Sequence, residues 1–298
     1  MAKTQDHGTD QDARLWSTLF LIMICFAANS VITRYLVLVS RVSPFLVTLI
    51  RFVSGLAVLL VLPLLFPTIL HRSKPTLTSL PGAVFLGAYA FSISYGYVFI
   101  SVAAGTFVFY TFVIVTMMLY SVIIEKTRFT AKMGLAQILG IAGVLVITFG
   151  RISSVTFPGI ALMAITGASW GSYSAYGKRF KEAFDYTYNS FLLLGVFAAA
   201  AALAIPLTGQ VVPTRISVAD LGLALYMGMI STALSYVLWN RTMKKISAHI
   251  GGLVQVTVPI LGATMGIILL REQLTASLIF GGALVVLGIY LSQYNRPS

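Results

Sequence analysis

Long apolar stretches, separated by short segments rich in charged residues, proline and glycine, fill almost the whole chain. Each stretch is close to the roughly 20 residues that an α-helix needs to cross a bilayer. The pattern predicts transmembrane helices at about 15–38, 44–66, 80–101, 104–124, 131–150, 157–178, 186–208, 218–240, 247–270 and 275–294. The third and fourth meet near Ser101–Thr106 with almost no polar residue between them, and Gly105 suggests a tight turn there.

Composition leads to the same class of protein. Of the 298 residues, 58% are hydrophobic and only 9% are charged, whereas a soluble domain averages about 25% charged residues. So little polar surface cannot cover a water-soluble fold of this size. Ten spans use nearly all of the length, so we expect an all-α membrane protein without a separate soluble domain.

The basic residues are distributed unevenly between the two sides of this topology. Fourteen Lys and Arg residues fall on the side that holds both termini, four fall on the other side, and Arg34 and Arg51 lie within helices. Such an asymmetry in short loops is the positive-inside signature, so we expect both termini in the cytoplasm and the protein in the bacterial inner membrane. It also accounts for the net charge of +12 without a nucleic-acid partner.

An internal repeat relates the two halves of the chain. "FAANSVITRY" aligns with "WGSYSAYGKR", and the spacing between matched residues is nearly constant for the pairs Phe26/Trp170, Ser30/Ser174, Arg34/Lys178, Thr130/Thr275 and Gly143/Gly288. The spacing predicts two five-helix halves, 1–152 and 153–298. Because each half has an odd number of spans, the second copy is inverted in the membrane, as in many transporters.

Three segments resemble the EamA-type, ten-helix branch of the drug/metabolite transporter superfamily: "TLIRF" around Arg51, "GASWGSYSAYGKR" around Trp170, and "TVPILGATMGIILLREQLTASLIFGGALVVLGIYL" near the end. The resemblance spans essentially the whole chain. It implies a substrate cavity between the halves, lined chiefly by helices 1, 3, 4, 6, 8 and 9, and export of amino acids, drugs or other metabolites. The fourth segment, "FYTFVIVTMML", lacks the Trp-Pro pair of the family's aromatic amino acid exporter.

Charged side chains are rare within the predicted spans. No carboxylate lies near a helix centre, which disfavours a proton relay and favours facilitated transport or exchange. His249 is the remaining titratable side chain that could take part in proton coupling. The alternative is that it simply lies at the membrane interface, which is the expectation here. Arg34 and Arg51 could each attract a substrate carboxylate, or could extend to the lipid headgroups.

Polar and aromatic residues at helical spacing are the remaining candidates for the substrate pathway. They are Thr166, Trp170 and Tyr173 on the sixth helix, Tyr89, Ser92 and Tyr95 on the third, and Ser235 and Tyr236 on the eighth. Such side chains should avoid lipid, and they could line a cavity or pack between helices. Trp239, near the predicted cytoplasmic end of the eighth helix, is expected to be an interfacial anchor.

Single polar or special residues add three expectations. Asn29, near the middle of the first helix, could hydrogen-bond a substrate or a neighbouring helix. Pro259 should kink the ninth helix and release the carbonyl of Gln255, which would make Gln255 part of the pathway unless the kink is purely structural. The pairs Gly167/Gly171 and Gly262/Gly266 have the spacing of close helix packing.

The sequence therefore predicts a transporter with inverted repeats that exports small metabolites, most notably amino acids, by alternating access. No P-loop, metal-ligand set or catalytic triad can be assembled, so neither ATP, a metal, a cofactor nor enzymatic activity is expected. An importer, a proton-coupled drug efflux carrier and a non-transporting receptor or assembly protein are the alternatives. The expected partners are a small-molecule substrate and lipids, and the expected state is a monomer or weak homodimer.

Overall fold

The computed structural model describes residues 3–67, 74, 76–100, 102–149, 155–204, 216–270 and 275–293. These residues are helical apart from short connections, and none of them is in a β-strand. The predicted boundary between the halves, at residue 152, and Glu272 at the predicted end of the ninth helix lie outside the described residues.

The helices of the first half agree closely with the predicted spans. They are α1 (Lys3–Arg34), which continues as the π-helical segment η1 (Tyr35–Val39), α2 (Pro44–Leu65), α3 (Leu80–Phe99) after the 3₁₀ turn η2 (Leu77–Ser79), α4 (Val102–Ile123) and α5 (Ala131–Thr148).

In the second half, two predicted spans are divided into shorter elements. The undivided helices are α6 (Phe157–Tyr176), followed by the 3₁₀ turn η3 (Gly177–Arg179), α7 (Ala183–Ala204) and α12 (Ala276–Gln293). The predicted eighth span consists of α8 (Val218–Tyr226), the π-helical η5 (Met227–Leu234) and α9 (Ser235–Met243), and the ninth consists of α10 (Ala248–Gln255) and α11 (Thr257–Leu270).

Hydroxyl side chains cap several helix starts. The side chains of Thr130, Thr156 and Ser217 accept hydrogen bonds from backbone N–H groups in the first turns of α5, α6 and α8. Such caps satisfy donors that have no partner inside the helix. Pro44 occupies the first turn of α2, where its missing N–H costs nothing.

The two predicted breaks in the helices are both present, but the break between the third and fourth helices lies before the predicted position. The chain leaves the helix at Ile100, between α3 and α4, whereas Gly105 lies inside α4, where a Cβ atom would lie 3.0 Å from Met163 Cε. The expected turn at Gly105 is therefore wrong by several residues. The ninth helix breaks at Val256, as expected if Pro259 cannot donate to the carbonyl of Gln255.

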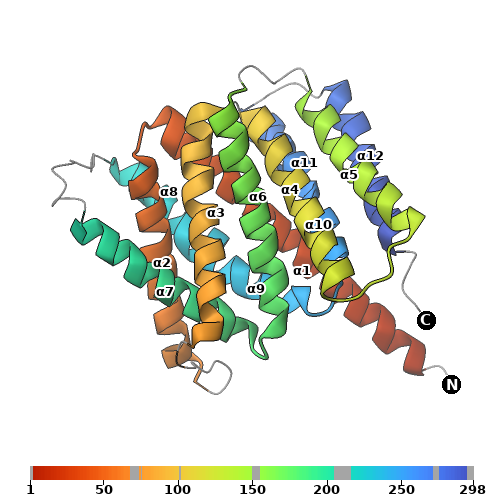
Figure 1. Ribbon diagram of the computed structural model, residues 1–298, viewed down its shortest axis with the longest axis horizontal. Helices are drawn as coiled ribbons and strands as arrows, with labels where there is room; N and C mark the ends of the chain where they lie inside the picture. Colours follow the sequence, from red (N-terminus) through yellow and green to blue (C-terminus); the bar gives the residue numbers. More distant parts are fainter. Residues whose placement is uncertain are drawn as a thin grey trace.

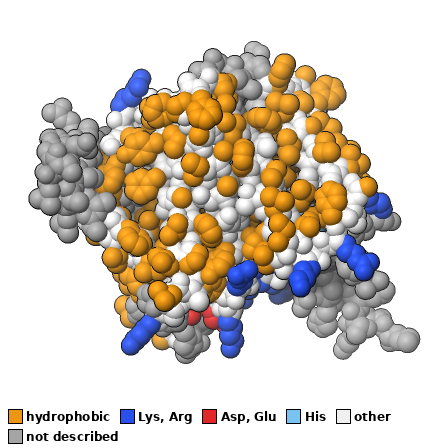
Figure 2. All heavy atoms as spheres, viewed as in Figure 1, with side chains coloured by type: hydrophobic (Ala, Val, Ile, Leu, Met, Phe, Trp, Pro, Cys, Tyr) orange, Lys and Arg blue, Asp and Glu red, His pale blue; other side chains and the backbone are white. Residues whose placement is uncertain are grey.

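The outer surface of the bundle is apolar. Large side chains such as Phe20, Leu64 and Phe280 are more than half exposed. Figure 2 shows hydrophobic side chains across the visible face and most of the visible Lys and Arg side chains along its lower edge. Among the described residues, seven helices are long and apolar enough to cross a membrane, and Ala276–Ser292 is a shorter apolar helix.

The packing of α5 against α12 reveals the relative direction of the two halves. A Cβ atom on Gly143 would meet Gly281 and Val285, whereas one on Gly288 would meet Ala136 and lie near Gly140. Residue numbers rise along one helix as they fall along the other, so α5 and α12 are antiparallel. Figure 1 shows both chain termini at one end of the bundle, which we call the terminal end.

Candidate functional site

A small cavity lies near the middle of the bundle, and both halves of the chain contribute to it. It is lined by six aromatic side chains, two amides and one serine: Phe26, Asn29, Ser30, Tyr89, Phe109, Tyr110, Trp170, Tyr236 and Gln255. We call these residues the central cavity. The space holds about one water molecule, so a larger solute requires the helices to separate.

Trp170 is the centre of this aromatic group. Its ring centroid lies 4.6 Å from that of Tyr236, 5.1 Å from that of Tyr89 and 5.4 Å from that of Phe26. Its indole N–H donates to Gln255 Oε1, which links α6 to the end of α10. Phe26 and Trp170 are a matched pair of the internal repeat, so equivalent positions of the two halves meet at the cavity.

Arg51 lies directly behind two of the cavity tyrosines. Its side chain is buried, with 2% exposure. Its Nε donates to Thr232 Oγ1 at 2.8 Å, and its Nη2 donates to the hydroxyls of Tyr236 at 2.7 Å and Tyr89 at 3.3 Å. The expectation that Arg51 extends to the headgroups is therefore wrong, because its polar partners are inside the bundle.

A π-helical segment brings Thr232 to Arg51. Within η5, Gly228 packs so closely against α2 that a Cβ atom would clash with Ser54 and with the backbone of Arg51. π-Helical turns are rare and often occur at functional sites. Thr232 Oγ1 also accepts from Asn29 Nδ2 at 3.4 Å, so this one hydroxyl connects α1, α2 and η5.

The other predicted residues lie farther from the cavity. Tyr173 is fully buried and stacks on Trp170, with its hydroxyl accepting from Asn240. The hydroxyls of Thr166 and Ser235 donate to carbonyls of their own helices, and Ser92 is buried without lining the cavity.

Arg34 and Tyr95 are both exposed, and neither lines the cavity. For Tyr95 the reason is helix geometry, since six residues at about 100° each place it roughly 120° around α3 from Tyr89.

Sequence reasoning did not select Phe26, Ser30, Phe109 and Tyr110. Phe26 and Ser30 could have been selected from the sequence, because both belong to matched pairs of the internal repeat. The expectation for Trp239 is wrong: this residue is fully buried, donates to Ser174 Oγ at 2.9 Å and packs edge-on against Phe26. It therefore supports the wall of the cavity and is not an interfacial anchor.

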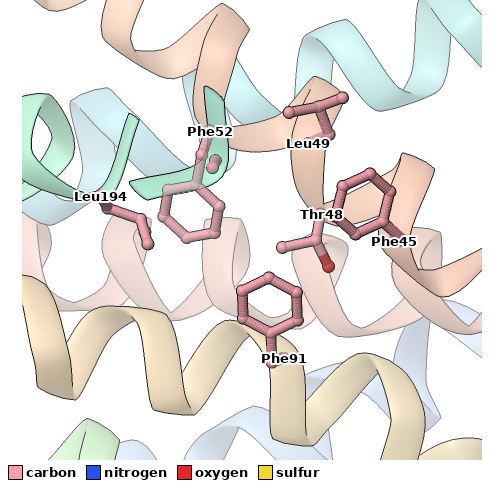
Figure 3. Close-up of a pocket in the computed structure, with 7 residues that line it drawn as sticks. Phe45, Thr48, Leu49, Phe52, Phe91 and Leu194 are labelled. Atoms are coloured by element: carbon pink, nitrogen blue, oxygen red, sulfur yellow. The ribbon is translucent and has the colours of Figure 1, made fainter. Parts of the chain in front are cut away.

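A second, apolar cavity lies between α2, α3 and α7. Its lining comprises Phe45, Thr48, Leu49, Phe52, Phe91, Leu194 and Ala198, and Figure 3 shows the rings of Phe45, Phe52 and Phe91 around this space. Thr48 is the single polar side chain in this lining, and its hydroxyl is hydrogen-bonded to that of Ser94 at 3.0 Å. The chemistry suited to a polar solute is therefore at the central cavity.

At the terminal end, residues at and just after the end of α4 in the first half contact η3, Ile246 and the start of α10 in the second. Glu125 pairs with Lys178 and accepts from the backbone N–H of Ala248 at 3.0 Å. Lys178 also donates to the carbonyl of Ile246, and Ser121 Oγ lies 3.2 Å from His249 Nδ1. We call Ser121, Glu125, Lys178, Ile246, Ala248 and His249 the terminal-end clamp.

The clamp should be insensitive to pH in the physiological range. Burial alone would raise the pKa of Glu125, but its hydrogen bonds with Lys178, Ala248 and Ser121 and the charge of Lys178 lower it below the ordinary 4.5. A lowered pKa means that the stabilisation is complete above 4.5 and is lost only as the pH falls through the folded-state value.

This predicts that a cysteine at Met117, just beneath the clamp, reacts with a hydrophilic thiol reagent at the same low extent from pH 8 to about pH 5.5, once reagent reactivity at each pH is corrected. A rise in labelling with a midpoint between pH 6 and 7 would contradict this prediction and would implicate His249.

Among the described residues, no group of His, Cys, Asp or Glu side chains is arranged to hold a metal ion. What the geometry offers is a small, aromatic-lined cavity with amide and hydroxyl groups, between two inverted halves of a helical membrane bundle. Inverted repeats around a central cavity are typical of membrane transporters. The model of the EamA-like transporter family matches residues 15–149 and 157–294, and the chain belongs to this family.

Similar proteins cover nearly the same length. An uncharacterized protein of Pseudomonas aeruginosa is 28% identical over 295 residues, covering 96% of this chain and 98% of that protein. An uncharacterized transporter of Archaeoglobus fulgidus is 25% identical over 261 residues, covering 85% and 90%. A solved crystal structure matches with a TM-score of 0.80 at 20% identity, covering 96% of this chain and 99% of that one. The predicted fold class, two inverted repeats of five helices, is confirmed, and so is the family.

Proposed function

We propose that this transporter exports amino acids with aromatic or apolar side chains across the bacterial inner membrane, by alternating access and without ATP. The observation that carries the proposal is the central cavity, whose lining combines aromatic rings from both halves with two amides, a serine hydroxyl and three tyrosine hydroxyls. Rings bind flat or apolar groups, and the few polar groups orient them. The export direction rests on the resemblance to the family.

In this proposal the terminal end faces the cytoplasm, as the distribution of basic residues predicts. The two halves, 1–152 and 153–298, rock about the central cavity. The clamp closes the cytoplasmic side in the described conformation, and transport requires the clamp to open. We keep the monomer or weak homodimer as the proposed state.

Amino acid flux into proteoliposomes tests the proposal. We expect saturable phenylalanine or leucine flux that is unaffected by a pH gradient. Trp170→Ala should reduce flux at low substrate concentration about tenfold or more, because a ring at the centre of the cavity is worth about 1.4 kcal/mol or more to a stacked ligand.

Trp16→Ala is the matched control, since Trp16 is partly buried near the start of the apolar span Ala13–Val39 and does not line the cavity. Both variants are compared at equal amounts of monodisperse protein. Flux that needs the gradient would contradict the uncoupled mechanism, and no flux of any amino acid would remove the substrate class while leaving the family unchanged.

A further inference from the structure

Arg51 is a buried cation whose hydrogen-bond partners are all neutral. Its hydrogen bonds go to the hydroxyls of Thr232, Tyr89 and Tyr236, and its guanidinium lies 5.3 and 5.4 Å from the ring centroids of Phe52 and Tyr89. A charge removed from water is costly unless an opposite charge compensates it. Hydroxyls and ring faces compensate only part of that cost.

The carboxylates whose side chains the structure describes are assigned to positions other than the hydrogen-bond partners of Arg51. Glu125 belongs to the terminal-end clamp, and Asp220 is hydrogen-bonded to Ser40 and Ser217 near the start of α8. Glu182 is exposed, and Asp185 is in the first turn of α7. The hydrogen bonds that Arg51 makes go to hydroxyl groups, so its positive charge can attract an anionic ligand.

Two tyrosines connect this charge to the central cavity. Tyr89 and Tyr236 both line the cavity, and both hydroxyl oxygens accept from Arg51 Nη2. A hydroxyl that accepts from a cation keeps its own proton for donation and becomes a stronger donor. The pair can therefore present donors to an anion in the cavity, with the guanidinium directly behind them.

An acceptor on the same cavity wall complements these donors. Asn29 lines the cavity and is 4% exposed, and its Oδ1 has no hydrogen-bond partner among the described residues. Its Nδ2 shares Thr232 Oγ1 with Arg51 Nε. A buried acceptor without a partner is costly, and an ammonium group would satisfy it.

We propose that Arg51, acting through Tyr89 and Tyr236, selects solutes with a carboxylate, and that Asn29 Oδ1 receives their ammonium group. This inference rests on the proposed function and specifies which end of the amino acid lies on which wall. Arg51 is a positioning residue, because the two tyrosines and Asn29 make the contacts. The side chain of the solute lies among Phe26, Tyr110 and Trp170.

Ligand analogues that differ in one group test the assignment. Binding to the purified, full-length protein is followed by tryptophan fluorescence, using phenylalanine, phenylalaninamide, 3-phenylpropanoate and 2-phenylethylamine. We expect phenylalanine to bind about 10–100-fold more tightly than either probe that lacks the carboxylate, and about tenfold more tightly than 3-phenylpropanoate.

The double variant Tyr89→Phe/Tyr236→Phe keeps both rings and removes both hydroxyls. In this variant the ratio of the affinity for phenylalanine to the affinity for phenylalaninamide should fall close to one. Tyr97→Phe is the matched control, since Tyr97 is buried on the same helix as Tyr89 and does not line the cavity. The control should keep the wild-type preference.

A measurement without ligand separates recognition from a structural role. Because the buried charge of Arg51 is only partly compensated by hydroxyls and ring faces, Arg51→Met should leave the melting temperature of the ligand-free protein unchanged or higher, while the preference for carboxylates is lost. A clearly lower melting temperature would overturn the inference. Equal binding of phenylalanine and 2-phenylethylamine would overturn it while leaving amino acid transport intact, whereas failure of all four probes to bind would overturn the proposed substrate class itself.

Discussion

Replacing Glu125 with glutamine is expected to open the terminal end of the bundle. The carboxylate holds Lys178 in η3, directly after α6, and the Ala248 N–H at the start of α10, both from the opposite half of the chain. Glutamine keeps one acceptor but removes the ion pair, and it leaves Lys178 partly buried without its counter-charge. Since these side chains are only 16% and 19% exposed, the cost should be about 1–2 kcal/mol, or roughly a 5–30-fold rise in the open population.

Thiol labelling measures this opening directly. Cys25 is replaced by serine, and a cysteine is introduced at Met117, which is fully buried between the central cavity and the clamp. The labelling rate by a membrane-impermeant reagent, applied from the terminal end, should rise roughly 5–30-fold in Glu125→Gln.

Glu182→Gln is the control for this experiment, because it removes the same charge from an exposed position outside the clamp. An unchanged labelling rate in Glu125→Gln would show that the clamp does not hold the terminal end closed.

The helices were predictable because lipid imposes a strong pattern. A span must satisfy its backbone hydrogen bonds internally and expose apolar side chains over a fixed length, so its ends coincide with polar residues and caps such as Thr130 and Thr156. The break at Val256 followed from Pro259, which has no N–H to donate. The π-helical segment η5 could not be predicted, because it depends on how closely Gly228 packs against α2.

The candidate site was only partly predictable, since residue spacing gives positions along a helix but not the direction in which its faces point. In a membrane both the cavity and the lipid accept aromatic rings, so Tyr89 and Tyr95 looked alike in the sequence although one lines the cavity and the other is 39% exposed. Trp239 looked interfacial because it lies near the end of its predicted span, and its indole partner, Ser174, is 65 residues away in the chain. Such long-range pairing is visible only in three dimensions.

Replacing Gly167 with alanine is expected to destabilise the protein strongly, although it adds only one methyl group. Gly167 lies where α6 crosses α4, and a Cβ atom there would clash with the carbonyl oxygen of Phe109 and lie 2.7 Å from Phe112 Cβ. The obstacle is backbone and a Cβ atom, neither of which can rotate away, so the two helices must move apart. Overpacking of this kind costs about 3 kcal/mol, which should lower the melting temperature of the detergent-solubilised protein by roughly 6–12 °C.

Gly262→Ala is the matched control, because Gly262 is also a helical glycine that was expected from its spacing to mark a close helix contact. The structure corrects that expectation, since a Cβ atom at Gly262 would meet nothing within 4 Å. Alanine is a better helix former than glycine by about 1 kcal/mol, so this variant should melt at the wild-type temperature or slightly above it. An unchanged melting temperature in Gly167→Ala would mean that the α4–α6 crossing has room for a methyl group, and equal losses in both variants would mean that overpacking is not the cause. A loss confined to Gly167→Ala would show that the α4–α6 crossing is a tightly packed contact between the two halves.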